Sequence, residues 1–402
     1  MLGTDPRPLV TLDIGAFVMQ ATWKTSLATL MAVGAAACSD RNPILEPGDS
    51  PASELPAVSG AGNAGAVFVS TNSTTGNEVL VFPRAGDGTL GAPRAFATGG
   101  TGTGGGLGNQ GAVVLNHAHQ RLFVANAGSN EVSVFAVIPG GLELMDRIAS
   151  GGTLPVSIAV HRSLVYVLNA GGTGNISGFE LDRDDNLRPL AGSTRPLSTS
   201  SADAAQVAFS PDGGLLVVTE KATNVIGTYT VGAGGLATGP DAQPSAGATP
   251  FGFAFGRNGT LVVSEAFGGG PDGSALSSYR ASPVGALSVI SPSVGTTETA
   301  ACWVVITGDG RFAYTSNTGS GTISGYRLSR AGELSLLDAN GVTATTMAGP
   351  IDLALTRNDR FLYSLDSGAG TISAFRVKAD GSLVPLAGAS GLPAGANGLA
   401  AR

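Results

Sequence analysis

Ile226-Gly227-Thr228-Tyr229 is one of seven short β-rich segments that each end in an aromatic residue. The copies recur at intervals of about 43 to 54 residues, which is the period of a β-propeller blade. Each is followed by a turn with Gly or Asn and then by a leucine. This pattern predicts an all-β fold, a seven-bladed β-propeller with four-stranded antiparallel blades over residues 66–402. The segments begin at Val79, Val132, Ile176, Ile226, Leu276, Ile323 and Ile372.

The two ends of the repeat region fit together. The first repeat lacks an innermost strand, whereas residues 395–400 at the end of the chain resemble the innermost strand expected at Pro350–Leu355. We therefore expect the C-terminal strand to complete the first blade and to close the ring without free sheet edges. An open β-solenoid is the alternative, but such a fold does not require the two ends of the chain to complete one repeat.

The composition agrees with an all-β protein and narrows the choice of partners. Of 402 residues, 61 are glycine, 43% are hydrophobic and 13% are charged. A disordered chain has lower hydrophobicity and higher charge, while glycine supplies the positive φ angles of tight turns. Because the net charge is −7 and no basic run occurs, we expect no nucleic-acid partner and no direct attraction to anionic lipid.

An apolar run near the N-terminus resembles the core of a signal peptide. Lys24 precedes it, and it extends from Leu27 to Ala37, too short to span a bilayer. The residues before Met19 do not look like a targeting region, so we expect translation to start at Met19. The run therefore predicts export; a buried N-terminal helix is the alternative.

Cys38 follows small residues, as at the processing site of a bacterial lipoprotein. Ala35 stands where such sites more often carry leucine, so ordinary signal cleavage is an alternative. We expect a leader over residues 1–38 and lipid attachment at Cys38, which places the protein in the periplasm or on the bacterial envelope. A disulfide with Cys302 is the other use open to Cys38. Residues 39–65, rich in Pro, Ala, Gly and Ser, predict a flexible tether.

Polar residues are predicted to gather on one face of the ring. The loops between the second and third strands of each blade share that face with the connections between blades, and binding sites collect there around the axis. We expect the following residues to contact a substrate: Asn109, Gln110, Asn126, Asn169, Gln206, Lys221, Trp303, Asn317, Asp352, Asp366 and Asn397. The glycine-rich segment at residues 101–110 enters the same face. Its amides could cradle an anion, or it is a plain connector.

Glu220 and Glu265 are the candidate catalytic residues. As a carboxylate pair on the binding face they would serve as general acid and base. Alternatively, each binds loop amides and stabilises a turn, as Asn and Asp do at the equivalent positions. Lys221 could hold a substrate carboxylate or be solvated, and Trp303 could stack on a ligand or pack in the core.

The histidines and the remaining cysteine indicate no further chemistry. His117, His119 and His161 fall in the turns between first and second strands, on the opposite face, and no third ligand accompanies the first two. Cys302 lies in an apolar strand and is expected in the core. No serine-nucleophile elbow occurs. We predict neither a metal nor a cofactor, and we expect a monomer.

The repeats, with their Ser-Pro-Asp-Gly turn at 210–213 and the Asn-Ala-Gly-Ser-Asn loop at 126–130, resemble the seven-bladed propeller lactonase family. That family includes 6-phosphogluconolactonase-like enzymes and the fungal carboxymuconate lactonizing enzyme. The likeness covers residues 66–402, and it implies a propeller that opens or forms lactones.

The active-site signature of that family is only partly present. Thr219-Glu220 matches its Asn-Glu in the glutamate, so Glu220 carries over. Pro155-Val156 stands where the family has Pro-His, and Ala204-Ala205-Gln206 stands where it has Arg-His. Ser264-Glu265-Ala266 lacks the arginine that some members carry. The expected proton-transfer histidine and the cationic substrate contacts are therefore absent.

Two functions follow from these features. The first is an exported enzyme that hydrolyses or forms a small lactone, with Glu220 or Glu265 as general base and loop amides at the oxyanion. The second is a non-catalytic envelope propeller that binds a glycan, a peptide or a protein. The missing histidine and arginine favour the second function, whereas the family likeness favours the first.

Overall fold

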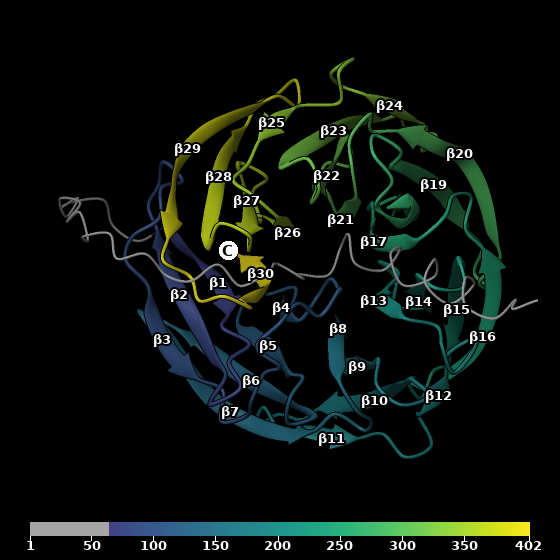
Figure 1. The fold of residues 1–402 in the computed structure, drawn as a ribbon. Coiled ribbons are helices and arrows are strands. Elements are labelled where there is room, and N and C mark those ends of the chain that lie inside the picture. The colour runs from purple at the N-terminus through teal and green to yellow at the C-terminus, as the bar shows by residue number, and fades with distance from the viewer. Residues whose placement is uncertain (1–63) are drawn as a thin grey trace, which may run out of the picture.

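The structure, a computed structural model, describes residues 64–402, which form seven antiparallel blades around a central axis (Figure 1). Five blades have four strands, and two carry a short fifth strand, β12 (Arg195–Pro196) or β25 (Ala344–Thr345). The predicted seven-bladed propeller is confirmed. The predicted leader, Cys38 and nearly all of the tether lie outside the described residues.

Each blade runs from an innermost strand at the axis to an outermost strand at the rim (Figure 1). The innermost strands are β30 (Asn397–Ala401), β4 (Val113–Leu115), β8 (Pro155–His161), β13 (Ala204–Phe209), β17 (Pro250–Phe255), β21 (Ala301–Ile306) and β26 (Pro350–Leu355). The second strands are β1 (Gly65–Ser70), β5 (Arg121–Asn126), β9 (Leu164–Asn169), β14 (Leu215–Glu220), β18 (Thr260–Glu265), β22 (Phe312–Asn317) and β27 (Phe361–Asp366).

The third strands contain the seven aromatic segments, as predicted. They are β2 (Glu78–Arg84), β6 (Glu131–Ile138), β10 (Asn175–Leu181), β15 (Val225–Val231), β19 (Ala275–Ala281), β23 (Thr322–Leu328) and β28 (Thr371–Val377). The outermost strands are β3 (Arg94–Ala97), β7 (Gly141–Ala149), β11 (Leu187–Pro189), β16 (Ala237–Pro244), β20 (Leu287–Gly295), β24 (Leu334–Leu336) and β29 (Leu383–Ser390).

The aromatic residues of the third strands are buried, and this burial explains why they recur. Phe135, Tyr229 and Tyr326 are almost fully enclosed in the apolar clusters that join the blades. Burying a large aromatic side chain in each blade contributes roughly 2–3 kcal/mol per residue. The same position therefore favours an aromatic residue in every repeat.

The chain closes the ring with its last strand. β30 pairs with β1 in antiparallel register, with Phe68 opposite Ala400 (Figure 1). Arg84 reinforces this closure, because its Nε donates to the Arg402 carbonyl at 3.1 Å and its Nη2 donates to the Ala64 carbonyl at 2.8 Å. The predicted completion of the first blade by the C-terminal strand is confirmed.

The ring has two faces. The turn face carries the turns between the innermost and second strands of each blade, and the loop face carries the second-to-third-strand loops and the connections between blades. A short 3₁₀ helix, η1 (Phe267–Gly269), follows β18 on the loop face. Within residues 64–402 no helix is long and apolar enough to cross a membrane.

Candidate functional site

A large cavity lies at the axis of the ring and opens on the turn face. Its volume is about 790 Å³. Its walls come from β4, β8, β13, β26 and β30, and its mouth is formed by the turns that follow β4, β8 and β13. The propeller fold thus brings residues more than 200 positions apart in the sequence, such as His117 and Leu355, to one site.

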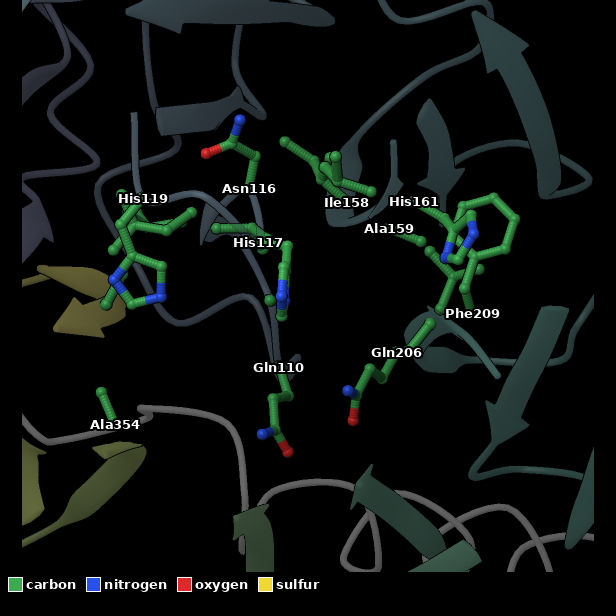
Figure 2. A pocket seen from close by; sticks show the side chains of 18 of the residues that line it. Gln110, Asn116, His117, His119, Ile158, Ala159, His161, Gln206, Phe209 and Ala354 are labelled. Carbon is green, nitrogen blue, oxygen red and sulfur yellow. The ribbon is translucent and has the colours of Figure 1, made fainter. Parts of the chain in front are cut away.

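Three histidines stand around the mouth of this axial cavity. His117 and His119 belong to the turn between β4 and β5, and His161 ends β8 (Figure 2). Arg162, in the next turn, also lines the mouth. The His161 ring lies 5.8 Å from the ring of Phe209, measured between centroids. The mouth therefore combines imidazoles, a guanidinium and an aromatic wall.

The floor of the axial cavity is polar and comes from three blades. Gln110 donates from Nε2 to the Val304 carbonyl at 2.9 Å and accepts from the Val304 amide at 3.1 Å. Gln206 makes the same pair of bonds with Phe253, at 3.0 and 2.7 Å. A primary amide has two N–H groups, so each glutamine keeps one N–H beyond these bonds.

Asp352 is the third floor residue and is only 3% exposed. Its Oδ1 accepts from the Leu353 amide at 2.8 Å and its Oδ2 accepts from the Leu399 amide at 2.8 Å. Burial nevertheless dominates and raises the pKa of this carboxyl to about 8. Asp352 therefore presents a neutral carboxylic acid to the cavity at pH 7.

Burial and nearby arginines lower the pKa values of two of the histidines. Burial lowers the pKa of His119, and the charges of Arg357 and Arg402 lower it further. Burial lowers the pKa of His161 as well; Arg162 adds to this effect, and Asp212 opposes it. Both imidazoles consequently stay neutral to a lower pH than an unperturbed histidine does.

The glycine-rich segment closes the axis on the loop face. The Trp303 indole donates to the Asn109 carbonyl at 2.7 Å, and the Gln110 amide donates to the Ala205 carbonyl at 3.1 Å. A Cβ at Gly252 would lie 2.2 Å from Gln110 Oε1, so this axial glycine leaves room for the crossing chain. These contacts hold the segment across the channel.

Lys221 is tied into the same closure. Its ammonium donates to the Gly108 carbonyl at 2.6 Å, pairs with Asp203 at 3.2 Å and lies 4.9 Å from the centroid of the Phe251 ring. Burial lowers the pKa of Lys221, while Asp203 raises it. The structure therefore brings Asn109, Gln110, Lys221 and Trp303 together, with Lys221 bound to the protein itself.

Glu220 and Glu265 are both fully buried in separate hydrogen-bond networks. Glu220 accepts from the Ser198 amide and from Thr223 Oγ1, each at 2.9 Å, and from Ser198 Oγ. Glu265 accepts from the Gly247 amide at 2.7 Å and from the hydroxyls of Ser293 and Ser277. Neither carboxylate lines the axial cavity. Each glutamate thus binds a main-chain amide of the chain that connects its blade to the preceding one.

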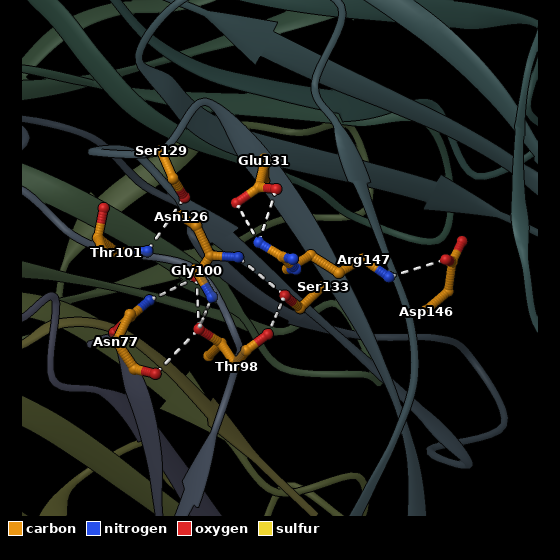
Figure 3. A network of polar contacts seen from close by, with 10 residues as sticks. All are labelled: Asn77, Thr98, Gly100, Thr101, Asn126, Ser129, Glu131, Ser133, Asp146 and Arg147. Atoms are coloured by element: carbon orange, nitrogen blue, oxygen red, sulfur yellow. Dashed lines mark hydrogen bonds and ion pairs between the residues drawn. The ribbon is translucent and has the colours of Figure 1, made fainter.

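The equivalent residues of other blades make similar networks. Asn126 accepts from Asn77 Nδ2 at 2.9 Å and Thr98 Oγ1 at 2.7 Å, and donates to Ser133 Oγ at 2.8 Å (Figure 3). Buried Asn169 bonds Asn175, buried Asn317 bonds Ser324, and Asp366 bonds Ser364 and Ser373. Burial raises the pKa of Asp366 to about 6. The position at the end of the second strand thus joins a blade to its own third strand.

Asn397, the remaining predicted contact residue, does not line the axial cavity. Asn397 is buried at the start of β30, and its Oδ1, like that of Asn109, makes no hydrogen bond within residues 64–402. Cys302 is buried in β21, as predicted. A smaller cavity of about 470 Å³ lies on the loop face between Ser73 and Thr101. In the described part of the chain no group of three or more metal-ligating side chains could hold an ion.

Sequence reasoning placed the histidines correctly on the turn face but did not connect them with a binding site. The structure places His117, His119, His161 and Arg162 at the mouth, and Gln110, Gln206 and Asp352 at the floor, of one cavity. The available signal was the concentration of basic side chains in consecutive turns of blades two and three.

Comparison with known families and structures supports the fold. The family described as "Lactonase, 7-bladed beta-propeller" matches residues 277–395, from β19 to the approach to β30. The matched segment is less than half of the chain. No curated protein sequence matches it.

Solved structures similar to this propeller come from several bacteria. The Pseudomonas aeruginosa periplasmic gluconolactonase is 15% identical with a TM-score of 0.64, over 83% of this chain and 98% of the other. A Lactobacillus plantarum protein is 15% identical with a TM-score of 0.68, over 84% and 99%. A Bacteroides uniformis protein, provisionally described as a 6-phosphogluconolactonase, is 17% identical with a TM-score of 0.65, over 83% and 99%. At these identities the likeness establishes the fold alone.

Proposed function

We propose that this lactonase-family propeller binds a small molecule in its axial cavity, through the turn face. The observation that carries this proposal is the convergence of Gln110, Gln206 and Asp352 at the floor of one cavity of about 790 Å³. Small-molecule sites typically measure about 300–1,000 Å³ and combine apolar walls with a few convergent polar groups. The opposite end of the axis is closed by the glycine-rich segment, so ligands enter from the turn face.

A cavity-filling variant tests the proposal. Leu355 lines the wall and is half-buried, so Leu355→Trp adds an indole to the cavity. The matched control is Leu236→Trp, at an exposed leucine ahead of β16. Ligand-observed NMR with a fragment library on residues 64–402 should give hits that Leu355→Trp removes and Leu236→Trp keeps. Hits that survive Leu355→Trp, or no hits at all, would refute binding in this cavity.

Lactone hydrolysis or formation is the second candidate function, and the family match supports it. In this reading Glu220 or Glu265 is the general base, and glycine-rich amides stabilise the oxyanion. The geometry requires the buried networks of both glutamates to open before a substrate reaches them. A panel of aryl, sugar and acyl lactones should therefore show no turnover by wild type. Turnover that the Glu220→Gln/Glu265→Gln double variant loses while staying folded would establish the enzyme instead.

The cellular setting is also a proposal. The signal-like run before Cys38 supports export, and a periplasmic protein of P. aeruginosa shares the fold. Fractionation of cells that express the full chain should place it in the envelope, and Cys38→Ala should release it from the membrane fraction. Recovery of the wild-type chain in the cytosol would contradict export. Because the ring leaves no blade incomplete, we propose a monomer, which gel filtration tests.

A further inference from the structure

We propose that the axial cavity selects small aromatic or short aliphatic carboxylates, with the carboxylate at the mouth beside Arg162, His117 and His161. This inference rests on the proposed function and names its ligand class. It concerns the turn face, where the sequence alone indicated no site. Charge, wall chemistry and floor chemistry support it independently.

The charge at the mouth is opposite to that of the whole chain. Arg162 lines the mouth, Arg402 donates to the His119 carbonyl at 3.4 Å, and Arg357 lies close enough to act on His119. The opposing carboxylate, Asp212, is held by its own turn, with bonds from Ser210 Oγ at 2.6 Å and from the Gly214 amide at 3.1 Å. On a chain of net charge −7, this cationic mouth attracts anions locally.

The wall behind the mouth is apolar. Four half-buried residues at or next to the ends of β4, β8, β13 and β26 line the cavity: Leu115, Val160, Phe209 and Leu355. Phe209 already packs against the His161 ring. A flat aromatic or short aliphatic body fits such a wall, whereas a polyhydroxylated acid would leave its hydroxyls facing hydrocarbon.

The floor offers hydrogen-bond donors to a neutral group. Gln110 and Gln206 each keep an amide N–H beyond their main-chain bonds, and the protonated Asp352 carboxyl has an O–H. These donors suit a hydroxyl or carbonyl oxygen at the far end of the ligand. A carboxylate with a polar group opposite to it, such as 4-hydroxybenzoate, is therefore the probe of choice.

Binding of an anion at this mouth should be linked to protonation. The charged and titratable groups around His161 are Arg162, Asp212 and His117, and those around His119 are Arg357, Arg402 and His117. Burial and the arginines disfavour imidazolium in the free protein, and a bound carboxylate offsets the charge of the arginines. Affinity should therefore increase as pH falls below about 6.5, the ordinary pKa of histidine.

Isothermal titration of the 64–402 propeller with 4-hydroxybenzoate tests the inference. We expect saturable binding, weakened at least about fivefold in Arg162→Gln by loss of the charge-assisted contact. Arg257→Gln, at an exposed arginine of another turn that does not line the cavity, should stay within about twofold of wild type. Neutral 4-hydroxybenzamide should bind at least about fivefold more weakly than the acid, and gluconate more weakly still. Circular dichroism confirms the fold of both variants.

Several results would overturn carboxylate selection. They are equal affinity for acid and amide, an unchanged affinity in Arg162→Gln, equal loss in Arg257→Gln, tighter binding of gluconate, or no saturation by 4-hydroxybenzoate. If fragments still bind in a manner that Leu355→Trp abolishes, only the ligand class is wrong and the proposed function stands. If Leu355→Trp changes no binding, the cavity itself is not the site.

Discussion

Replacement of Asp352 by asparagine should change how the stability of the propeller depends on pH. Asp352 is 3% exposed and forms no ion pair with any residue of the described chain. Only the amides of Leu353 and Leu399 bind it, and burial raises its pKa from 3.8 to about 8. Asparagine has nearly the same shape and does not titrate.

The sign of the effect follows from proton binding in the two states. The unfolded chain loses the Asp352 proton near its ordinary pKa, whereas the folded chain keeps it up to about pH 8. Between these values the folded state binds more protons, so stability falls as pH rises and levels off above the folded pKa. Each unit of pKa shift corresponds to about 1.4 kcal/mol, so the loss between about pH 5 and pH 8 is at most about 4 kcal/mol.

Asparagine removes this loss but introduces another. Its amide nitrogen faces either the Leu353 or the Leu399 N–H, so one hydrogen bond disappears at a cost of about 1–3 kcal/mol at every pH. Asp352→Asn should therefore be less stable than wild type at about pH 5 and should recover, relative to wild type, by about pH 8.

Urea unfolding followed by circular dichroism at the two pH values measures this difference. Other titrating groups, such as Asp366 and His161, are present in both proteins, so they cancel in the comparison. A difference in unfolding free energy between wild type and Asp352→Asn that is the same at both pH values would show that the carboxyl titrates normally. The inference that Asp352 is neutral at the floor of the cavity would then be wrong as well.

Three further substitutions test the ring and its buried networks, each by urea unfolding. Gly88→Ala should reduce the unfolding free energy by at least about 3 kcal/mol, because the φ of Gly88 is +99° and its Cβ would lie 2.3 Å from Phe361. The control, Gly259→Ala, has a φ of +78° and open space around it, and it should cost about 1 kcal/mol. Equal costs would contradict the packing argument. Tyr363→Phe removes the hydroxyl that bonds the Gly88 carbonyl at 2.7 Å between the last blade and the first, so we expect a loss of about 1 kcal/mol, and no loss would mean that this bond does not help to close the ring. Glu265→Gln leaves buried donors without a carboxylate and should lose about 2 kcal/mol, whereas full stability would argue that the network is dispensable.

The fold was predictable because its signals are local and repeated. Each third strand, such as Ile226 to Tyr229 in β15, carries its apolar pattern and its aromatic end within a few residues. If the strands of one repeat are ambiguous, the pattern of the other six assigns them. Closure was also readable, since β30 resembles the innermost strand β26 in sequence and takes the equivalent place.

The candidate site was only partly predictable, because no local pattern specifies which end of the axis is open. Gln110, Gln206 and Asp352 were recognised as axial residues, and all three line the cavity. Gln110, however, bonds Val304, 194 residues away, and Trp303 bonds Asn109 across the same distance. Contacts of this separation leave no periodic trace, so the closure of the loop face is not visible in the sequence of the segment that makes it.

Glycines in the segment at residues 101–110 and in the neighbouring loop after β5 allow close packing on the loop face. A Cβ at Gly102 would lie 2.1 Å from the Asn72 carbonyl carbon, and one at Gly128 would lie 2.1 Å from the Gly102 carbonyl oxygen. Side chains there would push the segment away from its neighbours, so glycine permits close backbone packing between these loops. A ligand entering from the loop face would have to displace these contacts and the Lys221 bond to Gly108. The turn face offers a cavity without such a rearrangement, and for this reason its histidines and Arg162 are the residues to change first.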